Sequence, residues 1–123
     1  MKIPRFYILA TGLTGAIAVG LGAFGAHGLE EILLDRGLTD VWKTASLYHL
    51  IHSVVLLALL SWKPFPTRTW WFFWAGIGIF SGTLYLMGLT GWRWLGAITP
   101  IGGTALIIGW VLLAFSIREQ KSE

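Results

Sequence analysis

The sequence predicts an all-α integral membrane protein, a four-helix transmembrane bundle with a short interfacial helix on its outer side. Hydrophobic residues make up 55% of the 123 residues and charged residues only 12%, about half the charged fraction that is usual in a soluble domain. The charge-free runs at residues 6–26, 44–62, 69–92 and 94–117 are each close to the roughly 20 apolar residues that a bilayer requires. Helices are expected because lipid offers no hydrogen-bond partner to an open backbone.

These runs predict a single membrane domain, residues 1–123, with spans at about 6–26, 42–62, 69–90 and 99–117. The connections between the spans are too short to hold a separate soluble domain. The first span is interpreted as a retained helix, because its apolar run is longer than the roughly 7–15 residues of a signal peptide. The fourth begins at a Thr-Pro pair, and proline is well tolerated in the first turn of a helix.

The segment between the first two spans is predicted to form a short helix, residues 28–36, on the outer membrane surface. Leu29 and Leu33 share one face of this helix, and charged residues occupy the others. Gly37 can end it in the left-handed conformation, and Thr39 can cap the following span. The acidic residues of this helix are expected to be solvated rather than to form a site.

Basic and aromatic residues predict the orientation. Lysine and arginine are twice as frequent on one side as on the other, and the richer side is expected to be cytoplasmic. This predicts a multi-pass protein of the inner (plasma) membrane with both termini in the cytoplasm, and with a belt of tryptophans at the membrane surfaces. The inner side holds Lys2, Arg5, Lys63, Arg68, Arg118 and Lys121 with Trp62, Trp70, Trp71 and Trp74, and the outer side holds Arg36, Lys43 and Arg93 with Trp42, Trp92 and Trp94.

Small residues on three of the spans predict close helix packing. In lipid, helices associate where glycine and alanine let their backbones approach. We expect these residues to pack inside the bundle rather than between copies, and the sequence leaves the oligomeric state open. They are Gly12, Ala16 and Gly20 with Ala18, Gly22 and Ala26 on the first span, Gly78 and Gly82 on the third, and Gly102, Ala105 and Gly109 on the fourth.

Histidines are the ionisable side chains nearest to membrane depth, where such groups are functional candidates. His49 and His52 share a face of the second span, and Tyr48 lies one turn before His52. The favoured interpretation is a buried imidazole that hydrogen-bonds across the bundle and sets the helix register. The alternative is a metal or haem site that uses His27, His49 and His52. A proton path is disfavoured because all acidic residues lie in the outer loop or the tail.

No catalytic constellation is evident in the residues. The chain has no cysteine, no HExxH zinc signature and no GxSxG nucleophile turn. Its positive charges are spread along the chain, so no basic run offers itself to nucleic acid. We therefore expect no enzymatic activity and no cofactor. The partners that we expect are the lipid bilayer and a larger membrane protein complex.

Four strings of residues carry a family resemblance. They are Gly22-Ala23-Phe24-Gly25-Ala26-His27, Trp42-x-Thr44-Ala45-x-x-Tyr48-His49-x-x-His52, Phe80-Ser81-Gly82-x-Leu84-Tyr85, and Thr99-Pro100-x-Gly102-Gly103 followed by Gly109-Trp110. In this order and spacing the set resembles the YgdD/YwdK-like family of small four-span inner-membrane proteins, a domain of unknown function. The resemblance implies four transmembrane helices and no established activity, ligand or cofactor. It also implies that another polar residue can replace His49, whereas His27 and His52 match the family pattern.

These strings collect toward the predicted outer half of the bundle. We therefore predict one polar cluster of His27, Tyr48, His52 and Tyr85, in which the two histidines bind a tyrosine or the backbone near Pro100. The function expected from this arrangement is that of a non-enzymatic structural or accessory membrane component.

Overall fold

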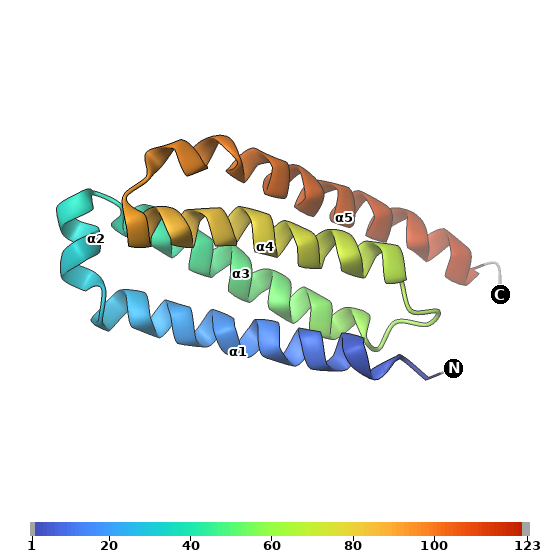
Figure 1. The fold of residues 1–123 in the computed structure, drawn as a ribbon. Coiled ribbons are helices and arrows are strands. Elements are labelled where there is room, and N and C mark those ends of the chain that lie inside the picture. The colour runs from blue at the N-terminus through green and yellow to red at the C-terminus, as the bar shows by residue number, and fades with distance from the viewer. Residues whose placement is uncertain (1, 122–123) are drawn as a thin grey trace.

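Four long helices run up and down beside one another, and a short helix crosses one end of the bundle (Figure 1). The computed structural model describes the backbone over residues 2–121 and the side chains over residues 2–116. No strand occurs in this part of the chain, so the protein is an all-α membrane bundle. The elements are α1 (Arg5–His27), α2 (Glu30–Arg36), α3 (Thr39–Leu59), α4 (Thr67–Thr90), the 3₁₀ helix η1 (Arg93–Ala97) and α5 (Thr99–Lys121).

Three segments of the described chain are long and apolar enough to cross a membrane: Arg5–His27, Thr67–Thr90 and Arg93–Ser116. Helix α3 is not among them, although it is of similar length. It carries two histidines, an aspartate and a lysine, and these lower its hydropathy. The four-span count therefore stays a prediction.

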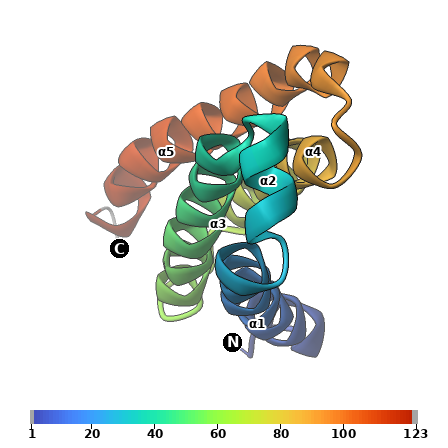
Figure 2. The same ribbon diagram turned by 90° about the vertical axis from the view of Figure 1, so that its left-hand side faces the viewer.

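Helix α3 is the centre of the bundle. It packs against α1 on one side and α4 on the other, and α5 packs along α4 and also reaches α3 through Trp110 (Figure 2). Its buried residues recur at alternating intervals of three and four, the spacing of a helix seam that faces its neighbours. They are Trp42, Ala45, His49, His52, Leu56 and Leu59, and Ser53 is buried beside this seam.

Two apolar clusters fill the bundle, one at each end. Trp42 is 3% exposed, packs in the cluster at the α2 end and donates from its indole nitrogen to the carbonyl of Leu21. Trp70 is fully buried in the other cluster. The predicted belt is therefore wrong for these two tryptophans, because their indoles fill gaps between helices. Trp71, Trp92 and Trp94 are exposed.

The glycines divide into those that meet a neighbouring helix and those that do not. A Cβ atom at Gly102 would meet the Phe80 backbone, and one at Gly25 would meet the Trp42 indole. At other glycines a Cβ would find nothing within 4 Å, so the prediction that they pack internally is wrong. These glycines are Gly12, Gly20, Gly78 and Gly82, of which Gly78 and Gly82 line a groove between α1 and α4.

Helix α2 connects α1 to α3 and covers one end of the bundle. Its buried Leu33 packs on Trp42, and Gly37 ends the helix with φ 66°, as predicted. Thr39 does not cap α3 as predicted, because the cap position is Leu38 and Thr39 is already helical. Arg36 instead caps the end of α4, where its guanidinium donates to the carbonyls of Gly88 and Leu89 at 2.8 and 2.7 Å.

The predicted orientation rests in part on Arg118 and Lys121, whose side chains lie outside the described residues.

Candidate functional site

His49 joins three helices at the centre of the bundle. Its Nε2 atom lies 2.9 Å from the backbone oxygen of Thr14 on α1, and its Nδ1 atom lies 2.9 Å from the hydroxyl of Tyr85 on α4. A carbonyl oxygen can only accept, so Nε2 carries the proton and Nδ1 accepts from Tyr85. The neutral form of His49 that fits these contacts is therefore the Nε2–H tautomer.

His52 is held in the opposite tautomer. Its Nδ1 atom lies 2.8 Å from the backbone oxygen of Tyr48, so Nδ1 donates. Its Nε2 atom lies 3.1 Å from the indole nitrogen of Trp110 on α5, and an indole N–H can only donate. Protonation of Nε2 would set two donors against each other, which keeps this imidazole neutral.

Further polar side chains link the helices around the histidines. Ser81 on α4 donates to the carbonyl of Ala45 on α3 at 2.8 Å. The indoles of Trp70 and Trp74 donate to the hydroxyls of Thr11 and Thr14 on α1, each at 3.0 Å. In an apolar medium each unmade hydrogen bond would be costly, so these pairs fix which faces of the helices meet.

The structure brings only part of the predicted cluster together. Tyr85 binds His49 rather than His52, and Tyr48 contributes its backbone oxygen and a ring stacked on His52. His27 is exposed at the end of α1 and hydrogen-bonds to none of the other described side chains. The prediction for His27 is wrong because the last turn of α1 lies at the rim of the bundle, away from the seam of α3.

The difference between the two histidines follows from helix geometry. Residues three apart on an α-helix are rotated by about 60° around its axis. His49 therefore faces α1 and α4, whereas His52 faces Trp110. Thr14 and Trp110 were missing from the predicted site. The spacing from Trp42 through Ala45 to the histidines was the available signal for a buried seam.

The histidines do not form a metal site in the described part of the chain. No three side chains of the histidine, cysteine, aspartate and glutamate types gather there. His27 lies apart, and every ring nitrogen of His49 and His52 already has a protein partner. A metal or haem iron could bind either imidazole only after a helix-to-helix hydrogen bond had broken.

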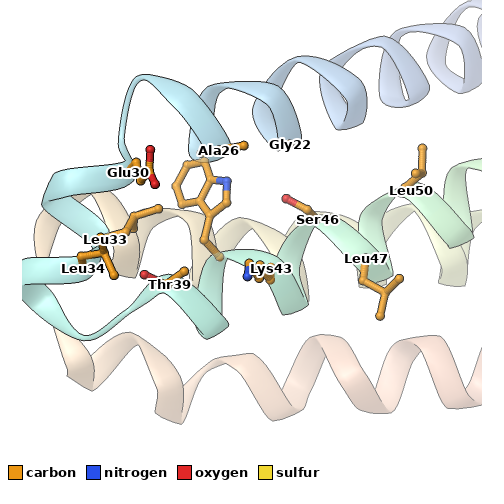
Figure 3. Close-up of a pocket in the computed structure, with 12 residues that line it drawn as sticks. Gly22, Ala26, Glu30, Leu33, Leu34, Thr39, Lys43, Ser46, Leu47 and Leu50 are labelled. Carbon is orange, nitrogen blue, oxygen red and sulfur yellow. The ribbon is translucent and has the colours of Figure 1, made fainter.

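Two cavities lie beside α1, and one of them reaches this cluster. A groove of about 500 Å³ between α1 and α4 reaches His49, Ser81 and Tyr85 at its base. A cavity of about 650 Å³ lies between α1, α2 and α3 at the α2 end (Figure 3). Its wall includes Trp42 and Ser46, and charged residues stand at its rim.

Comparisons with known proteins point to one family. The family described as "Protein of unknown function (DUF423)" matches residues 21–103. A UPF0382 membrane protein of Staphylococcus epidermidis is 43% identical over 116 residues, which cover 91% of this chain and 94% of the relative. The UPF0382 membrane protein YwdK of Bacillus subtilis is 42% identical over 115 residues, with 89% and 93% covered. No solved structure matches the chain at a significant level.

Proposed function

The chain belongs to the DUF423 family of proteins of unknown function, and we propose that it is a non-enzymatic component of the inner (plasma) membrane. In this role it acts through contacts with lipids and with other membrane proteins, as an accessory subunit does.

The observation that carries the proposal is the state of the two buried histidines. His49 and His52 are the ionisable groups best placed for chemistry at membrane depth, and each is about 5% exposed. Both ring nitrogens of each are used between or within helices. A catalytic or ligating histidine needs a nitrogen that can reach a substrate or metal. This arrangement supports a structural role for the cluster and a contact role for the surface.

The packing of α3 supports four spans with both termini in the cytoplasm. Helix α3 lies between α1 and α4 and runs along them (Figures 1 and 2). A helix in that position crosses the same thickness of membrane as its neighbours, and its polar residues can face inward. The excess of lysine and arginine on the α3–α4 turn and the N-terminal side supports a cytoplasmic position for that side.

Cysteine labelling tests this topology, since the chain has no cysteine of its own. Glu31→Cys on α2 and Trp94→Cys on η1 replace exposed residues at one end of the bundle, and Arg68→Cys does so at the other. A membrane-impermeant maleimide should label Glu31→Cys and Trp94→Cys in intact cells. It should label Arg68→Cys only after permeabilisation. Labelling of Arg68→Cys and Glu31→Cys from the same side would show that α3 does not cross.

Native mass spectrometry of the protein extracted gently from its own membrane tests the function. We expect a colourless chain without a cofactor mass that travels with lipid or with another membrane subunit. His52→Ala should lower the midpoint of thermal unfolding, because Trp110 and the Tyr48 carbonyl lose their partner. A stoichiometric haem or metal mass that disappears in His52→Ala would overturn the proposal.

A further inference from the structure

The cavity between α1, α2 and α3 changes character along its length. At the α2 end it is lined by Thr39, Lys43 and Ser46, and farther along α3 by Leu47 and Leu50 (Figure 3). From Thr39 to Leu50 the helix rises by about 16 Å. Leu33, Leu34 and Trp42 also line the α2 end, so the charged and hydroxyl groups of the cavity are confined to that end and the part farther along α3 is apolar.

The α1 wall of this cavity is bare. Gly22, Gly25 and Ala26 line it, and the space beside Gly22 is open, whereas the Trp42 indole fills the space beside Gly25. A Cβ atom at Gly22 would still lie 3.9 Å from the Ser46 hydroxyl, its nearest neighbour. The volume of about 650 Å³ is in the range of small-molecule sites, and the apolar end suits a slender hydrocarbon chain.

The polar end holds two opposite charges that are not paired with each other, and two hydroxyls. Glu30 on α2 and Lys43 on α3 both line the cavity, yet no ion pair joins them in the described structure. The Oγ1 atom of Thr39 is buried and has no hydrogen-bond partner, and the hydroxyl of Ser46 lies beside that of Tyr85. A buried hydroxyl without a partner is rare, and Thr39 lines the same cavity as the two charges.

We propose that this cavity binds a zwitterionic phospholipid whose headgroup carries a phosphate and a primary ammonium group. Lys43 and the hydroxyls of Thr39 and Ser46 bind the phosphate, Glu30 binds the ammonium, and an acyl chain follows Gly22 toward Leu50. This inference deepens the proposed function, because it names the lipid contact through which the protein acts.

The carboxylate of Glu30 decides between headgroups. An anionic phosphatidylglycerol headgroup has no positive group to offer Glu30. Phosphatidylcholine has the same net charge as phosphatidylethanolamine, but its quaternary ammonium has no N–H group to donate. Of these three headgroups, only phosphatidylethanolamine satisfies both charges with hydrogen bonds.

The test is native mass spectrometry of the full chain released from nanodiscs that hold equal amounts of phosphatidylethanolamine, phosphatidylcholine and phosphatidylglycerol. We expect one phosphatidylethanolamine to be retained about tenfold more than either other lipid, the ratio that one charge-assisted hydrogen bond supplies. Equal retention of the three lipids, or a preference for phosphatidylglycerol, would overturn the proposal.

Matched variants locate the site. Glu30→Gln should abolish the preference over phosphatidylcholine, whereas Glu31→Gln, an exposed neighbour outside the cavity, should keep it. Lys43→Gln should lower retention about tenfold, with Arg68→Gln at the opposite end of the bundle as its control. Gly22→Leu should fill the open space beside Ser46 and expel the lipid, and Gly12→Leu, which faces open space, should not.

These outcomes separate the inference from the function on which it rests. If the cavity variants retain lipid as well as the unaltered chain does, the lipid does not bind in this cavity, and the proposed non-enzymatic role is not affected. A cofactor mass in the same spectra would contradict the role, and the headgroup ratios would still report on the cavity. A circular-dichroism melt of each variant shows that lost retention does not reflect unfolding.

Discussion

Replacing Gly102 by alanine should destabilise the bundle by about 3 kcal/mol, the upper end of the usual cost of overpacking. A Cβ atom there would collide with the backbone nitrogen of Phe80 and lie 2.8 Å from its Cα atom and 2.9 Å from the carbonyl carbon of Ile79. Backbone atoms cannot rotate aside as a side chain can, so α5 must move away from α4. That movement would also draw Trp110 away from His52.

The measurement is SDS-induced unfolding followed by far-UV circular dichroism. Gly82→Ala is the matched control, because a Cβ atom on that glycine of α4 meets nothing within 4 Å. The control should be as stable as the unaltered chain or slightly more stable, since alanine favours helix. Equal stability of the two variants would show that α4 and α5 do not approach as closely as the structure has them.

Replacing Gly25 by alanine should have the next largest effect, a loss of about 2 to 3 kcal/mol. The added methyl group would overlap the indole of Trp42, with the Cε2 atom only 2.8 Å away. The indole cannot retreat, because Gly88 and Leu33 press on its other parts. A shift of the ring would also break its hydrogen bond to the Leu21 carbonyl. The same unfolding measurement reports this loss, with Gly12→Ala as the control on α1.

A second substitution shows whether the collision is the cause. Trp42→Phe removes the five-membered ring that the methyl group would strike. The double variant should therefore be more stable than the sum of the two single losses predicts, as expected for residues in direct contact. Strict additivity would contradict the packing of Gly25 on Trp42.

The sequence predicts the helices well and their ends less well. Charge-free runs find α1, α4 and α5 to within a few residues. Helix α3 begins at Thr39 rather than at residue 42, because Asp40 and Lys43 lie in its first turns at the membrane surface and interrupt the apolar run. It ends at Leu59 rather than at residue 62, a few residues before Pro64.

Which face of each helix meets a neighbour is harder to predict. Gly78 and Gly82 have the spacing of a close-packing pair, yet they face open space, whereas the isolated Gly76 meets Leu106. Small-residue spacing identifies a possible contact line but not the helix that occupies it. The rotation of α4 is set by Ser81 and Tyr85, whose partners on α3 are far away in sequence.

The sequence predicted a buried histidine cluster but not all of the residues that form it. A buried histidine cluster follows from two imidazoles on one apolar helix. The choice of His27 over His49 was wrong, because the end of a predicted span could not be placed relative to the next helix. Trp42, Ala45 and the two histidines follow one another at intervals of three and four residues, and this spacing predicts that His49 is buried.

The most direct test of the account is the protonation state of the three histidines, read by ¹⁵N NMR of the side chains in nanodiscs at neutral pH. We expect His49 to be neutral with its proton on Nε2 and His52 to be neutral with its proton on Nδ1. Both should be unchanged by added zinc, while the exposed His27 serves as the reference. A zinc-dependent shift of His49 or His52, or an imidazolium at either position, would contradict the structural role of the cluster.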